Sequence, residues 1–131
     1  MPILIVEDNP VNARLLVLML KAQGYKTVVA RNGKEGLTVL AETPDLQLII
    51  TDYMMPVMNG PDFCKEMRKD VTISHIPIIM LTGAGTDADA ILGLDSGAND
   101  YVTKPFDAAE LIARVKVHLK IKNLQDELKK S

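Results

Sequence analysis

The segment 46–56 constrains the fold more than any other part of the chain. Its run Leu48-Ile49-Ile50 has no polar residue at alternate positions, which is typical of a strand that is buried on both faces. Strands of this kind occur in parallel sheets that carry helices on each side. The run ends at Asp52, and the turn sequence Met-Met-Pro follows. Ligands of open α/β sheets bind at the carboxyl ends of the strands, so Asp52 is a candidate nucleophile, metal ligand or helix cap.

The same alternation of short apolar segments and helix-like segments extends along the whole chain. The predicted strands lie at 3–6, 26–30, 46–52, 76–81 and 101–102. Helices are predicted to begin near Pro10, Asn32, Gly60, Thr86 or Asp87, and Asp107. This order predicts one α/β domain, in which a doubly wound parallel sheet is covered by helices on both faces.

Two helices have apolar faces that we expect to pack on the sheet. In the first helix this face consists of Val11, Leu15, Leu18 and Met19. In the last helix it consists of Leu111, Ile112, Val115 and Leu119.

The composition argues against several classes of protein. A length of 131 residues fits one domain with one core, and a net charge of −2 argues against a dedicated nucleic-acid surface. The single cysteine, Cys64, rules out an internal disulfide and is expected to be a small buried hydrophobic residue. No apolar run has the length of a membrane span, and the N-terminus lacks the features of a signal peptide. We therefore expect a cytoplasmic protein.

Residues with functional groups stand at the ends of four of the five predicted strands. They are Glu7, Asp8, Asp52, Thr82 and Lys104. Each alone is explained by capping or by a solvated charge, but the carboxyl ends of parallel strands meet at one edge. Three clustered carboxylates favour a hard cation such as Mg²⁺. The cluster contains no His or Cys, so a zinc site is not expected. A carboxylate beside a cation, an ammonium and a hydroxyl suits phosphoryl transfer.

This ordered set of residues resembles the receiver domain of bacterial two-component response regulators. The resemblance covers residues 2–120 in order and at the spacing of the family. The matching residues are Glu7-Asp8, Asp52, Met55-Pro56, Gly60, Thr82-Gly83, Tyr101 and Lys104-Pro105.

The resemblance implies a flavodoxin-like (βα)5 fold with strand order 2-1-3-4-5 and Asp52 as the phosphorylated residue. It implies a Mg²⁺ site, which Mn²⁺ can also fill. Asp8, Asp52 and the backbone carbonyl of Met54 are the expected ligands, and Glu7 is expected to act through a metal-bound water.

The resemblance also assigns a phosphate-binding and switching role to residues after the fourth and fifth strands. Thr82, Gly83 and Ala84 are expected to contact the phosphoryl group. Lys104 is expected to bridge first to Asp52 and then to the phosphoryl oxygens, and its bond to Pro105 is expected to be cis.

Tyr101 is the expected switch residue of the domain. Movement of Thr82 toward the phosphoryl group would leave space for the Tyr101 ring to turn inward, which would change the surface made by the fourth helix, fifth strand and fifth helix. Met54 and Ala84 occupy positions that tune the lifetime of the aspartyl phosphate in the family. Neither side chain orients water well, so we hypothesise slow self-hydrolysis.

The expected partners follow from the same resemblance. The phosphodonor is a phosphohistidine on a sensor histidine kinase or a histidine phosphotransfer protein, and the recipient of the signal is a downstream protein or an output domain. No direct contact with nucleic acid or membrane is expected. The chain would catalyse its own phosphorylation and dephosphorylation, and it is not expected to be an enzyme with a separate substrate.

Other functions fit parts of this pattern. A phosphatase of the haloacid-dehalogenase type also forms an aspartyl phosphate, but it needs an acid two residues after the nucleophile, where this chain has Met54. A flavodoxin-like nucleotide or flavin binder would need a glycine-rich or hydroxyl-rich loop in place of Glu7-Asp8-Asn9-Pro10. A receiver that serves as an unphosphorylated scaffold is disfavoured by the complete set of site residues.

The last helix carries a second apolar stripe on the side opposite its docking face. Its members are Val117, Ile121, Leu124 and Leu128, and their spacing is that of a coiled coil. We divide the chain into a receiver domain at 1–120 and a helical extension at 121–131. The stripe favours pairing with a second copy or continuation into an output domain over a tail that folds back on the body. The charged residues around it, including Lys122, are expected to face solvent. The sequence leaves open whether the chain is a stand-alone regulator or part of a longer one.

Overall fold

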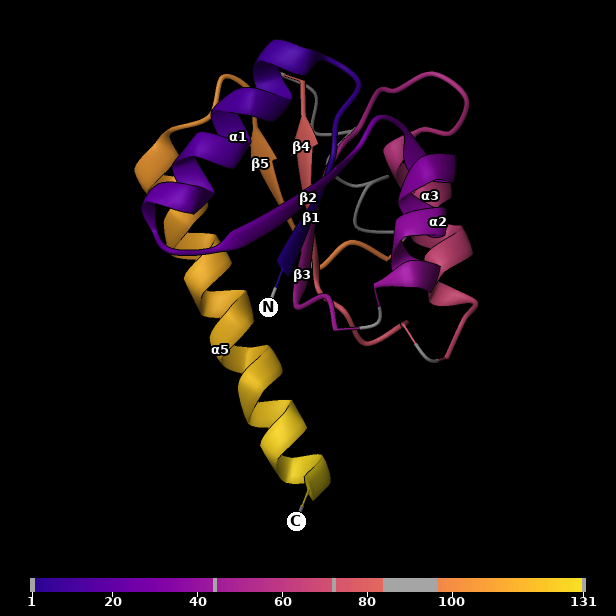
Figure 1. Ribbon diagram of the computed structural model, residues 1–131, viewed down its shortest axis with the longest axis vertical. Helices are drawn as coiled ribbons and strands as arrows, with labels where there is room; N and C mark the ends of the chain where they lie inside the picture. Colours follow the sequence, from indigo (N-terminus) through magenta and orange to yellow (C-terminus); the bar gives the residue numbers. More distant parts are fainter. Residues whose placement is uncertain (1, 44, 72, 84–96, 131) are drawn as a thin grey trace.

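A computed structural model describes residues 2–43, 45–71, 73–83 and 97–130 of the chain. Its centre is a parallel sheet of five strands in the order β2-β1-β3-β4-β5 (Figure 1). The strands are β1 (Pro2–Val6), β2 (Lys26–Ala30), β3 (Leu48–Asp52), β4 (Ile78–Thr82) and β5 (Asp100–Thr103). The predicted α/β fold and strand order are therefore confirmed. Strand β4 begins two residues later than predicted, after Pro77, which has no N–H to donate to the sheet.

The described helices begin at the cap residues that the sequence offers. The helices are α1 (Pro10–Ala22), α2 (Gly33–Glu42), α3 (Gly60–Arg68) and α5 (Ala108–Lys130). The side-chain oxygens of Asn9, Asn32 and Asn59 accept hydrogen bonds from backbone N–H groups in the first turns of α1, α2 and α3. Gly24, with φ of 85°, follows α1, and its N–H donates to the carbonyl of Lys21. The fourth helix, predicted from Thr86 or Asp87, lies outside the described residues.

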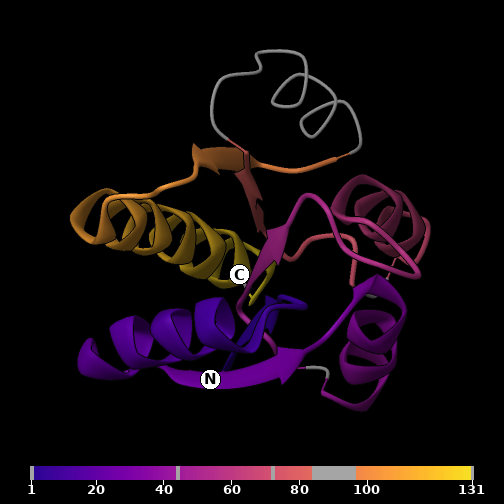
Figure 2. The same cartoon turned by 90° about the horizontal axis from the view of Figure 1, so that it is seen from above.

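The sheet separates two layers of helices. Helices α1 and α5 cover one face, and α2 and α3 cover the other, as the view from above shows (Figure 2). Alternate residues of β3 enter the two halves of the core: Leu48 and Ile50 pack under α1 and α5, and Ile49 packs under α2 and α3. The apolar run that defined the fold in the sequence is thus fully buried on both faces.

The prediction of which face of α1 packs on the sheet is wrong. Val11, Leu15 and Leu18 are exposed, whereas Met19 is partly buried. The side chains that α1 buries in the core are Ala13, Leu16 and Leu20. Residues 15–18 form a continuous apolar run, so a helical period fits more than one face of this helix.

Helix α5 is continuous from Ala108 to Lys130, across the predicted domain boundary at residue 120, and it projects beyond the body of the domain (Figure 1). Its predicted docking face is confirmed, because Leu111 and Val115 are fully buried and Ile112 and Leu119 pack against the same core. The expectation for Lys122 is wrong: its side chain is buried and forms an ion pair with Asp126 at 2.6 Å. None of the helices in the described ranges is long and apolar enough to cross a membrane.

Arg68, at the end of α3, ties the segments that precede β4 and β5 to the rest of the domain. Its guanidinium donates hydrogen bonds to the carbonyls of Ser74, Ile76 and Gly97, the last two at 2.9 Å and 2.7 Å, and to the side-chain oxygen of Asn99 at 2.7 Å. Asn99 in turn accepts a hydrogen bond from the N–H of Ile78 at the start of β4. This network fixes β4 and β5, whose carboxyl ends carry Thr82 and Lys104.

Candidate functional site

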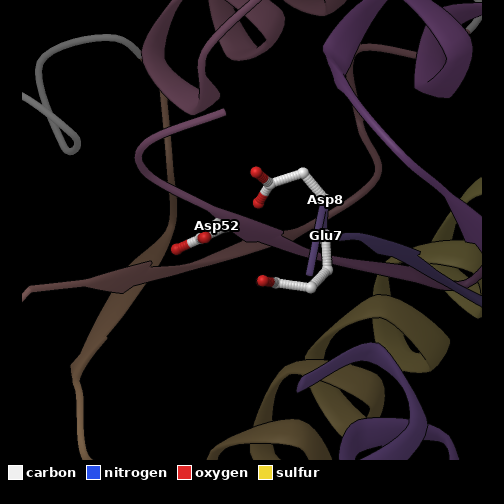
Figure 3. A group of neighbouring side chains, drawn as sticks. All are labelled: Glu7, Asp8 and Asp52. Atoms are coloured by element: carbon white, nitrogen blue, oxygen red, sulfur yellow. The ribbon is translucent and has the colours of Figure 1, made fainter. Parts of the chain in front are cut away.

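Three carboxylates gather at the carboxyl edge of the sheet. Glu7 and Asp8 directly follow β1, and Asp52 is the last residue of the neighbouring strand β3. One oxygen of each carboxylate lies within 4.8 Å of the others. In Figure 3 the side chains of Glu7 and Asp8 extend toward Asp52, so the cluster predicted from the strand ends is present.

Glu7 is the most buried member of this cluster. Its Oε1 accepts one long hydrogen bond, 3.4 Å from the N–H of Asn9, while its buried Oε2 has no hydrogen-bond partner among the described residues. The nearest cation to Oε2 is the ammonium of Lys104, at 3.7 Å. Burial, followed by the charge of Asp52, raises the pKa of Glu7 from 4.5 to about 7, although Lys104 and the Asn9 N–H act in the opposite direction.

Asp52 is held by a cation and by its own strand end. The Nζ of Lys104 lies 2.8 Å from Oδ1 of Asp52, and the N–H of Tyr53 donates to the same oxygen at 3.0 Å. The N–H of Lys104 donates to the carbonyl of Thr82 at 2.7 Å, which fixes the start of this segment against β4. The Lys104–Pro105 peptide bond is cis.

Gly60 brings helix α3 against the backbone of Asp52. Its N–H donates to the carbonyl of Tyr53 at 2.9 Å, and a Cβ at this position would lie 2.4 Å from the carbonyl oxygen of Asp52. Gly60 was predicted from the sequence to lie in a turn and matches the family, but this close contact was not predicted. An Asn-Gly-Pro sequence that begins seven residues after a strand-end acid does not by itself show which backbone the glycine packs against.

The other predicted site residues occupy different parts of the same edge. Thr82 is buried at the end of β4, and Gly83 follows it and is exposed. The Met54 side chain is exposed in the loop after β3, and Tyr101 on β5 is 38% exposed, so its ring is not turned inward. Ala84 lies outside the described residues.

The carboxylate cluster fits a hard divalent cation. Every donor in it is a carboxylate oxygen, and one of these oxygens is buried without a hydrogen bond, so the chain supplies ligands of the type that Mg²⁺ prefers. The ammonium of Lys104 neutralises one of the three negative charges, so a divalent ion would balance the remaining two.

A second polar cluster, which was not predicted from the sequence, joins β5 to α5 beside Tyr101. Asp100 accepts hydrogen bonds from Arg114 at 2.7 Å and 2.9 Å and contacts Nε2 of His118 at 3.1 Å. Burial acts to raise the pKa of Asp100, but the hydrogen bonds from Arg114, His118 and the Tyr101 N–H outweigh it and hold the pKa below its ordinary value. The signal in the sequence was the spacing of Arg114 and His118, which places both side chains on one face of a helix.

Known proteins share this fold and are similar to this chain in sequence. A family model, the response regulator receiver domain, matches residues 3–116. The chain belongs to this family, and it is the receiver domain of a two-component response regulator.

Its relatives among characterised proteins are longer. The DNA-binding response regulator MtrA of Mycolicibacterium smegmatis is 45% identical over 119 residues, which are 90% of this chain and 50% of MtrA. The response regulator PleD of Caulobacter vibrioides is 40% identical over 128 residues, 97% of this chain and 28% of PleD. The chain thus spans half or less of the length of these relatives.

Solved structures agree with the fold over nearly the whole chain. The signal receiver domain of a signal transduction histidine kinase from Syntrophus aciditrophicus has a TM-score of 0.85 and 38% identity, and the match covers 91% of this chain and 89% of that one. The receiver domain of the Francisella response regulator 1452 has a TM-score of 0.82 and 35% identity, with 91% and 96% covered. The predicted family and fold are therefore confirmed.

Proposed function

We propose that Asp52 is the residue of this receiver that is phosphorylated. The observation that carries this proposal is the contact of 2.8 Å between its Oδ1 and the ammonium of Lys104, inside a cluster of three carboxylates. A buried carboxylate that already has a cation next to it can accept a phosphoryl group whose charge the same cation then neutralises.

The proposed donor is a phosphohistidine on a sensor histidine kinase or a histidine phosphotransfer protein. A carboxylate oxygen of Asp52 attacks phosphorus, the bond between phosphorus and the imidazole nitrogen breaks, and the imidazole takes a proton from solvent. Lys104 turns from the carboxylate to an oxygen of the transferred group, and the hydroxyl of Thr82 donates to another. The chain catalyses only its own phosphorylation and the later hydrolysis of its aspartyl phosphate.

We assign the Mg²⁺ ligands to Asp8, Asp52 and the backbone carbonyl of Met54, with Glu7 acting through a water. When bound, the ion supplies charge neutralisation of the phosphoryl oxygens during transfer. The unpartnered Oε2 of Glu7 supports this assignment, because a cation or its water would satisfy a buried oxygen that otherwise has no hydrogen bond.

Exposed apolar residues close to the site provide a surface for the donor protein. Val11 lies in the first turn of α1, three residues after Asp8, and Met54 and Val57 lie in the loop after Asp52. All three side chains are exposed. Apolar side chains around a charged centre are suited to a protein partner, which can bury them while the charged groups react.

The output is a change in the surface of β5 and α5. Thr82 moves toward the phosphoryl group, and Tyr101, exposed before phosphorylation, turns inward. Tyr101 follows Asp100, which Arg114 and His118 hold on α5, so a movement of this strand is transmitted to the helix. A protein partner or an output domain recognises this surface; the DNA binding that is named for MtrA is not assigned to this chain, whose net charge is −2.

The test is phosphorylation of the whole chain by acetyl phosphate with Mg²⁺, followed by intact mass spectrometry. We expect wild type to gain one phosphoryl group, Asp52→Asn to gain none, and the control Asp45→Asn, an exposed acid outside the site, to behave as wild type. Equal modification of Asp52→Asn and wild type would refute the assignment of Asp52.

A further inference from the structure

Helix α5 has an apolar surface that the domain itself does not cover. The four residues of the stripe, Val117, Ile121, Leu124 and Leu128, are between 45% and 75% exposed. The opposite side of the same helix is already occupied, because Leu111 and Val115 are buried in the core. The stripe therefore does not serve as the docking face of α5. It begins beside the body, where Leu119 still packs against the core, and continues toward the C-terminal end of the helix, which projects from the body (Figure 1).

The charged side chain of Lys122 does not form part of this exposed surface. Lys122 is 4% exposed, on the side of α5 that faces the body, and pairs with Asp126 one turn further along the same helix. The outer side is left to the apolar stripe, with exposed polar residues on its flanks. A surface with an apolar centre and a polar rim is typical of a protein interface.

The spacing of the stripe makes it complementary to itself. Its members are separated by four, three and four residues, which are the steps of a heptad seam. When a second copy of the helix runs antiparallel, Val117 lies opposite Leu128 of the second copy, and Ile121 lies opposite Leu124 of the second copy. A two-fold axis then repeats both contacts, so all four residues are covered in one symmetric interface.

The flanking charges favour the antiparallel orientation. Lys120 and Glu127 are exposed on the same flank of the stripe, at equivalent positions of successive heptads. In an antiparallel pair Lys120 faces Glu127 of the second copy, and symmetry provides this ion pair twice. In a parallel pair Lys120 instead faces the uncharged Gln125, so the parallel orientation lacks the two ion pairs.

We propose that α5 binds a second copy of this chain in an antiparallel pair through Val117, Ile121, Leu124 and Leu128. The interface is short, less than two heptads, so the dimer is weak and forms at high protein concentration.

Disulfide crosslinking tests the orientation. The native Cys64 is buried, with its pKa raised to about 12, so a cysteine placed on the exposed helix reacts selectively. A mixture of Lys120→Cys and Glu127→Cys should form the mixed disulfide dimer faster than either variant alone forms its own dimer. Leu128→Cys alone would crosslink rapidly only in a parallel pair, because the two copies of Leu128 lie at opposite ends of an antiparallel interface, and that result would overturn the proposal.

Sedimentation velocity tests the interface without a crosslink. The sedimentation coefficient of wild type should rise between about 20 µM and about 1 mM, a range that brackets a weak dissociation constant. Leu124→Asp should remain monomeric, while Asn123→Asp, which adds the same charge off the stripe, should associate as wild type; circular dichroism checks that both are folded. A wild type that stays monomeric throughout, or a Leu124→Asp that still dimerises, would overturn the proposal.

Discussion

Replacement of Glu7 by Gln should make the domain more stable above neutral pH when no divalent ion is present. The Glu7 side chain is 1% exposed. The nearest ammonium, that of Lys104, lies 2.8 Å from Asp52 but 3.7 Å from Glu7. The charged form of Glu7 is therefore disfavoured in the folded state, and its pKa rises from 4.5 to about 7. Gln has nearly the same shape and carries no charge, so Glu7→Gln removes this unfavourable ionisation.

The sign and the size follow from proton linkage. Between a pKa of 4.5 in the unfolded chain and about 7 in the folded one, the folded state binds more protons, so the free energy of unfolding falls as the pH rises through this range. The full difference corresponds to about 3 kcal/mol, since each pKa unit is worth about 1.4 kcal/mol. This pKa difference already contains the attraction of Lys104, so we expect Glu7→Gln to be more stable than wild type by about 3 kcal/mol at about pH 8 and by less than about 1 kcal/mol at about pH 5.

Urea denaturation, followed by far-ultraviolet circular dichroism in the presence of EDTA, measures this difference at several pH values. Glu42→Gln is a matched control, because Glu42 is exposed and its replacement should give an offset that does not change between about pH 5 and about pH 8. Addition of about 10 mM Mg²⁺ should stabilise wild type more than Glu7→Gln and so reduce the gap. A difference between Glu7→Gln and wild type that is constant with pH, or a less stable variant at about pH 8, would refute the reasoning.

Other predictions concern the framework around the site, each measured by urea denaturation. Gly60→Ala should lower the free energy of unfolding by about 3 kcal/mol, because the new Cβ would meet the backbone of Asp52 at 2.4 Å; Gly83→Ala, where a Cβ meets nothing within 4 Å, should change little. Arg68→Met should cost about 2–4 kcal/mol, since three carbonyls lose their donor; a smaller cost than that of Lys65→Met would contradict it. Val57 is exposed with φ of 70°, at the centre of a turn closed by the hydrogen bond from the Met58 N–H to the Pro56 carbonyl. Asn adopts positive φ more readily than a β-branched residue, so Val57→Asn should raise the free energy of unfolding by about 1 kcal/mol.

The sequence predicted the sheet and the site edge for one physical reason. A parallel strand that is buried on both faces must be apolar throughout, and its first polar residue marks the point where it leaves the core. Thr82 is such a residue in β4, and Asp52 is the first charged residue of β3, after the buried Thr51. The structure ends the two strands at Asp52 and Thr82. Glu7 and Asp8 follow β1 in the same way, so the carboxylate cluster could be located before any distance was known.

The features that the sequence did not reveal depend on contacts between distant residues. The inner face of α1 could not be selected, because Leu15 and Leu16 are both apolar and only the sheet decides which of them is buried. The burial of Lys122 depends on how far the body extends along α5. The link between Asp100 and Arg114 joins residues fourteen positions apart, and their opposite charges alone do not select Arg114 among the cations of the chain.

The charge balance of the site links its stability to its proposed function. Three carboxylates and one ammonium leave two negative charges, and the pKa of Glu7 near neutrality shows that the folded chain does not hold them without cost. Burial of Glu7 and its repulsion from Asp52 both favour a divalent cation, which would bring the local charge to about zero. Conversion of Asp52 to an aspartyl phosphate then adds roughly one further negative charge beside Lys104. Lys104 directly follows β5, the strand that carries Asp100 and Tyr101. A shift of Lys104 toward the new charge therefore acts directly on the surface that we propose a partner recognises.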